Sequence, residues 1–498
     1  MGHALQGSDR KSSIREKRNM KTALNYIDGI WCPASAERTG ACINPATGEP
    51  AAHYVNATLP EIEAAIAGAR HCFESSTWSS QPKLRSDVLR LFADRLEARK
   101  DEIVDVLVEL NGKLRREAEG EVLAGISELR YYAGLARNLF GRVLEIEPQI
   151  YSMIEREAIG VAAIIVPWNA PITLLVRSLA PALAAGCAVV IKAAHQTALV
   201  HAMVVECLVQ DTRLPRGLVQ SFVEDGADGA KLLCAHVEVD VISFTGSTQV
   251  GKLIAGSTAK NLTRLSLELG GKAPAIVLPD TSIADAVRGI VPGACVMAGQ
   301  MCTAISRVLV HESIAEGFKA ALVEGLRQIR VGPGQLAASS MGALIDRRNQ
   351  QRLLDEVQSA RETCEVLLAG TVPQDLPRAG AFLTPSLIAT QDLQSHFVQD
   401  EIFGPVITLE TFSDDEDALT RANATRYGLA SSIWTNDFKR ARQIARRLKF
   451  GNVWINAHNR LFAEVETGGY RESGLGRLHG VDGLSDFLET KHVYMPCA

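Results

Sequence analysis

The sequence lacks strong net charge, long apolar runs and aromatic side chains. Its 498 residues carry 52 Lys and Arg against 57 Asp and Glu, so no basic surface for a nucleic acid partner is expected. The longest nearly unbroken apolar stretch, residues 179–191, is too short for a membrane span and contains a proline and a glycine. Aromatic residues make up only 5%, whereas glycine is plentiful at 40, which favours a turn-rich α/β chain over a β-sandwich.

Paired cysteines are also missing. The ten cysteines form no Cys-x-x-Cys pair and are spread through apolar segments, which is typical of reduced thiols in a cytoplasmic protein. Neither a disulfide framework nor a metal site is therefore expected. Residues 1–21 are basic and polar without the apolar core of a secretory signal, and we expect a disordered tail there.

Most of residues 160–329 alternates between short apolar runs and segments of helical spacing, after two amphipathic helices predicted over residues 83–110. The predicted strands are 160–166, 188–191, 218–223, 241–244, 273–278 and 307–311. The predicted helices between them are 172–185, 197–209, 229–236, 248–257, 283–298 and 314–329. Short runs rich in valine and isoleucine, separated by helices, predict α/β architecture with parallel sheets covered on both faces.

Open parallel sheets bind ligands beyond the carboxyl ends of their strands. The residues at these ends are Pro167-Trp168-Asn169, Lys192 and Thr245-Gly246-Ser247, and we expect them to line one crevice. The free N–H groups of the helix that starts there suit a pyrophosphate. However, the spacing from Gly246 to Gly251 is not the G-x-G-x-x-G fingerprint, so this pattern alone is equally compatible with a glycine turn that binds nothing.

Two residues stand out as candidates for chemistry. Glu268 ends an apolar strand before a glycine pair, where desolvation raises the pKa of a carboxylate towards that of a useful general base, although a lone Glu is more often a surface residue. Cys302 follows a helix among small polar residues, a setting that favours a nucleophile, although most cysteines are small core residues. The local sequence leaves both alternatives open.

Six separated blocks nevertheless resemble the aldehyde dehydrogenase superfamily, in order and spacing, along nearly the whole chain. The blocks are Pro167–Pro171, Phe244–Ser247, Glu268–Lys272, Gly299–Cys302, Glu401–Pro405 and Gly468–Tyr470. The resemblance implies that Cys302 attacks the aldehyde and that the Asn169 amide and the Cys302 N–H hold the oxyanion. Hydride transfer then leaves a thioester, and Glu268 activates the water that hydrolyses it.

The resemblance also implies how a cofactor, NAD or NADP, and a small-molecule aldehyde are held. Glu401 binds the nicotinamide ribose and Phe403 packs near the ring, Trp168 and Ser247 contact the pyrophosphate, and Lys192 contacts the adenosine ribose. The further residues expected around the cofactor are Pro167, His195, Thr245, Gly246, Gly251 and Leu269. Those expected around the aldehyde are Leu174, Arg177, Met301, Thr303 and Arg460.

The sequence departs from the family pattern at three positions, one beside the cofactor and two behind the general base. Many relatives have a Glu at the position of His195, where it chelates the adenosine ribose and repels a 2′-phosphate; a neutral imidazole removes this repulsion, so we expect NADP to be admitted alongside NAD. Relatives often have a Lys at the position of Ser178 and a Glu at that of Leu478, as a proton relay behind the general base. With both absent, Glu268 must lose its proton by another route, and we expect that route to run through water.

Arg177 is expected to face the aldehyde if the family register holds. A cation there disfavours quaternary-ammonium aldehydes, because like charges about 5 Å apart cost roughly 3 kcal/mol at an effective dielectric constant near 20. It suits a carboxylate, so we favour an acidic semialdehyde, with an aromatic aldehyde as the alternative. The second arginine of succinic-semialdehyde enzymes, six residues before the nucleophile, is Val296 here.

Other enzyme and non-enzyme functions fit the sequence less well. A coenzyme-A-acylating dehydrogenase does not need Glu268, and an inactive scaffold would have no reason to keep Cys302, Asn169 and Glu268 together. The resemblance implies a cofactor-binding domain (22–147 and 160–269), a catalytic domain (270–482) and a small β flap (148–159 and 483–498). In relatives this flap pairs across subunits, so a homodimer or homotetramer is expected.

Overall fold

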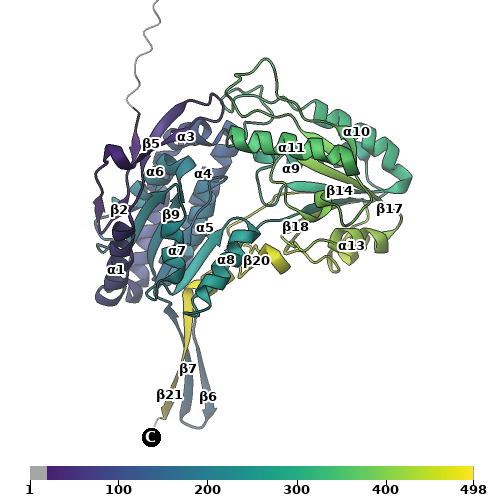
Figure 1. The fold of residues 1–498 in the computed structure, drawn as a ribbon. Helices are drawn as coiled ribbons and strands as arrows, with labels where there is room; N and C mark the ends of the chain where they lie inside the picture. Colours follow the sequence, from purple (N-terminus) through teal and green to yellow (C-terminus); the bar gives the residue numbers. More distant parts are fainter. Residues whose placement is uncertain (1–19, 497–498) are drawn as a thin grey trace, which may run out of the picture.

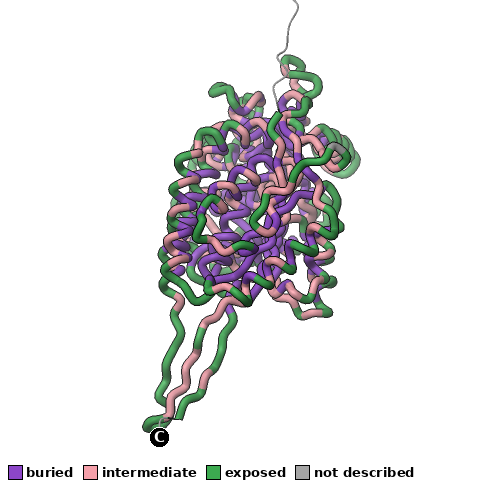
Figure 2. The backbone as a smooth tube through the Cα atoms, turned by 90° about the vertical axis from the view of Figure 1, so that its left-hand side faces the viewer, coloured by how far each residue is buried: buried purple, intermediate pink, exposed green. Residues whose placement is uncertain are grey.

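The structure is a computed structural model that describes residues 20–496, so most of the predicted tail over residues 1–21 lies outside the described residues. The described chain forms two α/β bodies side by side, and a narrow β flap projects from the first of them (Figure 1). The bodies are densely buried inside, whereas the flap is exposed or half-buried along most of its length (Figure 2).

The first body is built on an eight-stranded sheet with the order β20-β12-β11-β8-β9-β10-β2-β3. Its five central strands are parallel, and β20, β2 and β3 add antiparallel edges. The central strands are fully or largely buried runs without alternation, as expected for a sheet covered on both faces. The bounds are β2 Tyr26–Ile27, β3 Ile30–Trp31, β8 Val161–Ile165, β9 Ala188–Ala194, β10 Val219–Glu224, β11 Val241–Thr245, β12 Arg264–Glu268 and β20 Gly474–Leu475.

Two rows of helices pack on this sheet. One row is α1, α7 and α8, and the other is α5 and α6, with α2, α3 and α4 packed outside α5 and α6. The bounds are α1 Leu59–Ser75, α2 Pro82–Ala98, α3 Lys100–Asn111, α4 Arg115–Leu135, α5 Pro171–Ala185, α6 Ala198–Val209, α7 Asp228–Ala235 and α8 Thr248–Thr258. A three-stranded sheet of β1 Thr22–Ala23, β5 Pro50–Val55 and β4 Thr39–Ile43 lies beside α6.

The second body has a seven-stranded sheet with the order β15-β16-β17-β14-β13-β18-β19, parallel except for β15. Neighbouring residues of β13 face opposite sides, so Ala275 and Val277 join one apolar cluster and Ile276 joins another. The strands are β13 Ala273–Val277, β14 Ile305–His311, β15 Glu365–Leu368, β16 Ser386–Ala389, β17 Val406–Phe412, β18 Ala430–Trp434 and β19 Asn452–Ile455. The helices are α9 Ile283–Cys295, α10 Ala315–Arg327, α11 Arg347–Thr363, α12 His396–Gln399, α13 Asp415–Asn423 and α14 Phe438–Ala445.

The flap joins β6 Arg142–Glu147, β7 Ile150–Ala158 and β21 Leu488–Pro496 into an antiparallel sheet. The predicted domain bounds do not follow two of the strands. β6 belongs to the flap but lies within the predicted cofactor-binding domain (22–147), and β20 lies within the predicted catalytic domain (270–482). β20 pairs with β12 of the first sheet, so the C-terminal segment crosses between the two bodies.

The predicted α/β architecture, with two parallel sheets and a small β flap, is confirmed. Two boundaries were wrong. β9 runs on to Ala194, so Lys192 lies inside the strand instead of beyond it. The predicted helix 283–298 ends at Cys295, because Met297 and Ala298 adopt the left-handed conformation and the Glu117 carboxylate accepts the Met297 N–H at 2.8 Å.

Candidate active site

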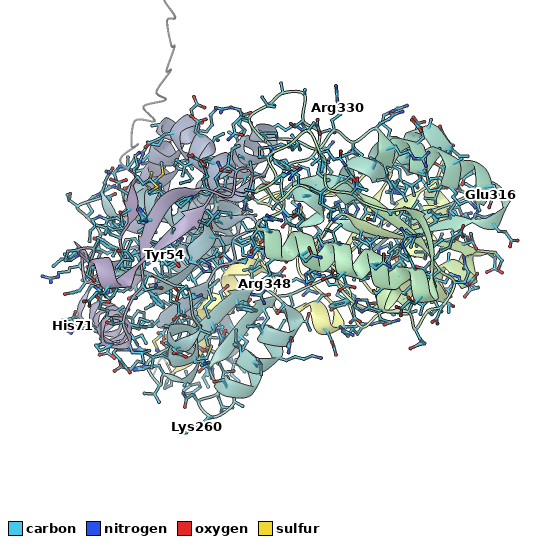
Figure 3. The ribbon with its side chains drawn as sticks, turned by 45° about the horizontal axis from the view of Figure 1, so that its top comes forward. Tyr54, His71, Lys260, Glu316, Arg330 and Arg348 are labelled. Carbon is cyan, nitrogen blue, oxygen red and sulfur yellow. The ribbon has the colours of Figure 1, made fainter. Side chains whose placement is uncertain are left out.

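The residues predicted to share a crevice do lie on neighbouring strands. β12, β11, β8 and β9 are adjacent and parallel, and their carboxyl ends lead to Glu268, Thr245, Pro167-Trp168-Asn169 and His195. All these groups therefore lie along one edge of the sheet. Arg348, in the first turn of α11, lies near the junction of the two bodies (Figure 3).

The turn between β11 and α8 is shaped for close approach to a ligand. Ser247 is the N-cap of α8, and its hydroxyl accepts the Val250 N–H at 3.3 Å. A Cβ on Gly246 would lie 2.3 Å from the Phe244 ring, and one on Gly251 would lie 2.5 Å from the Leu269 side chain. A larger residue at either position would displace a packed side chain, so glycine suits this turn and this helix packing. The helix N-terminus offers N–H groups and a positive dipole end to a phosphate. These features fit a dinucleotide.

A second group surrounds the end of β9. The Lys192 ammonium lies 3.9 Å from the Glu224 carboxylate, and burial lowers the pKa of Lys192. Burial also lowers the pKa of His195, so its imidazole is neutral at pH 7. The carboxylates of Asp225 and Asp346 oppose this shift and are the negative charges that act on His195.

Trp168, Phe403 and Glu401 meet near the thiol of Cys302. The Trp168 and Phe403 rings lie edge to face, with centroids 5.9 Å apart. Glu401 accepts the Gly271 N–H at 3.2 Å, and burial raises its pKa to about 7. Cys302, Glu401 and Phe403 line one small pocket, so the aromatic pair and the carboxylate lie next to the thiol.

Cys302 also lines a larger cavity of about 540 Å³ together with Asn169 and Glu268. The thiol is carried by the turn after the left-handed residues 297–299, where a Cβ on Gly299 would lie 2.4 Å from the Gly404 backbone. Burial raises the pKa of the Cys302 thiol to about 12, while the Arg177 guanidinium opposes the shift. The free thiol is therefore protonated at neutral pH.

The position of Asn169 is fixed by a buried network. Its side-chain amide donates to the Gln300 carbonyl at 3.1 Å, and its own backbone carbonyl accepts the Lys113 ammonium at 2.8 Å. Lys113 pairs with Glu121, whose other oxygen accepts the Ile172 N–H at 2.8 Å. These contacts hold the amide beside the turn that carries Cys302, which is the geometry an oxyanion donor needs.

Glu268 is paired with Arg177. The Arg177 guanidinium lies 3.9 Å from the Glu268 carboxylate and donates to the Thr245 hydroxyl at 3.0 Å. Burial raises the pKa of Glu268, and the Arg177 charge acts in the opposite direction. The carboxylate is therefore a buried base whose ionised form is supported most by the Arg177 cation.

Most of the residues predicted around the aldehyde line this cavity: Leu174, Arg177, Met301 and Thr303 do so. Arg460 does not; it is exposed and lines a separate surface depression with Arg288 and Trp434. The adjacent Asn459 lines the cavity instead, and the Arg460 backbone carbonyl accepts the Trp454 indole N–H at 3.0 Å.

Sequence reasoning missed several cavity residues. α4 presents Glu117, Glu121 and Glu128, and the C-terminal segment adds Phe462 and His479. The spacing of the three glutamates, four and then seven residues apart, is a single helical face and could have been recognised. Nothing local indicates that His479 reaches the cavity.

The described part of the chain has neither a cluster of metal ligands nor a membrane-spanning helix. Within residues 20–496, no three His, Cys, Asp or Glu side chains are grouped to hold a metal ion. None of the helices in that part combines the length and hydropathy needed to cross a bilayer.

Together the cavity offers a thiol, an amide donor and a buried carboxylate base, and Asn169 and Glu268 follow strands on the same edge of the sheet as the N-terminus of α8. A nucleophilic cysteine with these neighbours suits transfer of an acyl group to water coupled to removal of a hydride.

Known proteins resemble this chain along most of its length. The model of the "Aldehyde dehydrogenase family" matches residues 31–493. Betaine aldehyde dehydrogenase of Bacillus subtilis is 35% identical over 94% of this chain and 96% of its own. A crystal structure of betaine aldehyde dehydrogenase from Staphylococcus aureus in complex with NAD+ is 33% identical, with a TM-score of 0.92, and the match covers 95% of this chain and 94% of that one.

Proposed function

The chain belongs to the aldehyde dehydrogenase family, an NAD(P)-dependent oxidoreductase family, and from this premise we propose which of its residues carry the reaction. The observation that supports the assignment is that Cys302, Asn169 and Glu268 line one cavity. Asn169 and Glu268 lie at the carboxyl ends of β8 and β12, on the same edge of the sheet as the carboxyl ends of β9 and β11.

Cys302 is the nucleophile. Because its pKa is raised to about 12, the thiol must lose its proton as it attacks the aldehyde carbon, and the Arg177 charge favours the thiolate. The Asn169 amide and the Cys302 N–H donate to the oxyanion of the thiohemiacetal. Losing one such donor typically costs about 10²–10³ in rate.

The cofactor residues bind and orient the dinucleotide. The α8 N-terminus with Ser247 holds the pyrophosphate, Lys192 and His195 lie at the adenosine end, and Glu401 with Phe403 lies at the nicotinamide end. When bound, NAD(P) accepts the hydride from the adduct. Glu268 then takes a proton from the water that attacks the thioester on Cys302, releasing the carboxylic acid.

The cavity supports a neutral, apolar aldehyde as substrate. Leu174, Met301 and Phe462 supply apolar surface, and the side chains of Glu117 and Glu464 add negative charge at the lining. The Arg177 charge is already matched by Glu268 at 3.9 Å. An incoming carboxylate would compete with the general base for this cation, which favours an aromatic or other neutral aldehyde.

An acidic semialdehyde is the second candidate. Arg177 is the one Lys or Arg side chain that lines this cavity among the described residues, and its buried Nε has no hydrogen-bond partner. A substrate carboxylate could satisfy this group.

A substrate panel separates these candidates. With benzaldehyde, succinic semialdehyde and betaine aldehyde, the neutral aldehyde should have the highest kcat/KM. Arg177→Ala should reduce kcat for all three, because it removes the partner of Glu268. A loss confined to the semialdehyde would instead assign Arg177 to substrate recognition.

The remaining assignments concern cofactor choice, domains and assembly. A neutral His195 leaves NADP admissible alongside NAD, and the ratio of kcat/KM for the two measures the preference. We assign cofactor binding to the first body, the catalytic domain with its nucleophile Cys302 to the second, and assembly into a homodimer or homotetramer to the flap. The uncovered edges of β6 and β21 support the last assignment, because unpaired strand edges can add strands of a second copy.

A further inference from the structure

His479 and Glu128 form a buried pair in the wall of the cavity that the assigned roles leave unused. The His479 Nδ1 and a Glu128 carboxylate oxygen lie 2.8 Å apart, and both side chains are more than nine-tenths buried. Both residues line the cavity that contains Cys302 and Glu268. The other Glu128 oxygen has no hydrogen-bond partner.

The backbone of His479 adopts an unusual conformation. Its φ of 62° is in the left-handed region, which residues with a Cβ rarely adopt. The neighbours hold it there: Leu478 exchanges two backbone hydrogen bonds with Thr467, and the Tyr132 hydroxyl donates to the Gly480 carbonyl at 3.0 Å. A strained residue fixed from both sides, with its side chain in a reaction cavity, indicates function.

The positions of the family's proton relay cannot serve Glu268 here. The Ser178 hydroxyl is engaged with the Ser243 hydroxyl at 2.9 Å, and Leu478 is a buried apolar side chain. Glu268 nevertheless collects a proton in every turnover and must release it before the next.

The charged groups around Glu268 come from several elements. Arg177 on α5, together with Arg477 and His479 from the C-terminal segment, favours the ionised carboxylate, whereas Asp486 disfavours it. Two carboxylates lie close to the segment that carries His479. Glu128 comes from α4, and Glu466 accepts the N–H groups of Val481 and Asp482 at 2.9 and 3.2 Å. Among these groups His479 is the imidazole, which has one ring nitrogen bonded to Glu128 and a second that can exchange a proton.

We propose that the His479–Glu128 pair receives the proton that Glu268 takes from the hydrolytic water; this inference rests on the proposed role of Glu268. As a water O–H bond breaks, its oxygen bonds to the thioester carbon, and the proton goes to the Glu268 carboxylate. Cleavage of the C–S bond then releases the carboxylic acid and a Cys302 thiolate, which takes the proton of that acid and returns to the thiol. The Glu268 carboxylic acid passes its proton, through cavity water, to His479 Nε2. Glu128 accepts the Nδ1–H and balances the imidazolium until the proton leaves to solvent; no electrons are exchanged.

The pair acts as a positioning and proton-accepting unit behind Glu268, so its loss should slow deacylation without slowing hydride transfer. His479→Gln keeps a donor for Glu128 but cannot carry the proton. It should form NADH normally in a single turnover with benzaldehyde, then accumulate acylated enzyme, detected by intact mass, while kcat falls at least tenfold. Glu128→Gln should show the same pattern more weakly, and imidazole should restore turnover to His479→Ala.

His201→Gln is the matched control, because His201 is a buried histidine bonded to Ser221 in the first body, outside the cavity. It should leave the rate of deacylation unchanged. Any of three results would overturn the inference. His479→Gln could keep the wild-type kcat, or it could lose hydride transfer and turnover equally. The third such result is that imidazole does not restore turnover to His479→Ala. If instead the wild-type enzyme forms no NADH in a single turnover, the proposed function itself fails.

Discussion

At the scale of single residues, the candidate reactive groups depend on buried partners. Cys302, Glu268 and Asn169 line one cavity, and local sequence blocks were enough to select these three as candidates. Arg177 is expected from the sequence to face the aldehyde, and in the structure it lines the cavity, pairs with Glu268 and donates to Thr245. Glu128 and His479 are 351 residues apart, so only the folded chain shows that they meet.

The protonation of the Cys302 thiol can be tested directly. Since burial raises its pKa to about 12, the thiolate fraction of the free enzyme should rise about tenfold per pH unit across neutral and mildly alkaline pH. Alkylation of Cys302 by iodoacetamide, followed by peptide mass spectrometry, should show this slope between pH 6.5 and about 9.5. A plateau beginning near pH 7 would contradict the buried, protonated thiol.

At the scale of elements, alternating apolar runs and helical segments predicted the strands and helices of residues 160–329 to within a few residues. This works because parallel strands buried on both faces are short, continuous apolar runs. The insertion of β20 beside β12 could not be predicted, because Gly474–Leu475 is two residues long and its pairing is set by tertiary contacts. The end of α9 at Cys295 likewise depends on Glu117 of another helix.

The N-cap of α8 can be compared with the N-cap of α9, which lies in the other body. Ser247→Ala removes the N-cap hydroxyl, so the free energy of unfolding should fall by about 1 kcal/mol, and the KM for NAD should rise severalfold. Ser282 caps α9 in the same way, accepting the Asp285 N–H at 3.3 Å. Ser282→Ala should lose similar stability in urea unfolding but keep the KM. An equal change of KM in both variants would show that Ser247 acts only on stability.

At the scale of the whole molecule, the exposure of the apolar residues of the flap has no explanation within a single chain. All six residues of β6 are exposed, including Val143 and Ile146, and the flap extends away from both bodies (Figure 1). A three-stranded sheet with solvent on most sides is marginally stable alone, so contact with a second copy would complete it.

We therefore expect light scattering to show a dimer or tetramer that Val143→Glu with Ile146→Glu breaks down. Leu336→Glu, the same kind of change at an exposed apolar residue in a loop outside the flap, should leave the assembly intact. A wild-type monomer, or an unchanged assembly in the double variant, would remove the flap from the interface.

In the proposed mechanism, Cys302 becomes acylated while NAD(P) is reduced. A rapid quench of the enzyme with NAD and benzaldehyde tests this step, with NADH and the mass of the Cys302 peptide followed together. The covalent mechanism predicts one acyl group on Cys302 for each NADH formed in the first turnover, and neither product in Cys302→Ser. Aldehyde-dependent NADH formation that persists in Cys302→Ser, without an adduct, would contradict it.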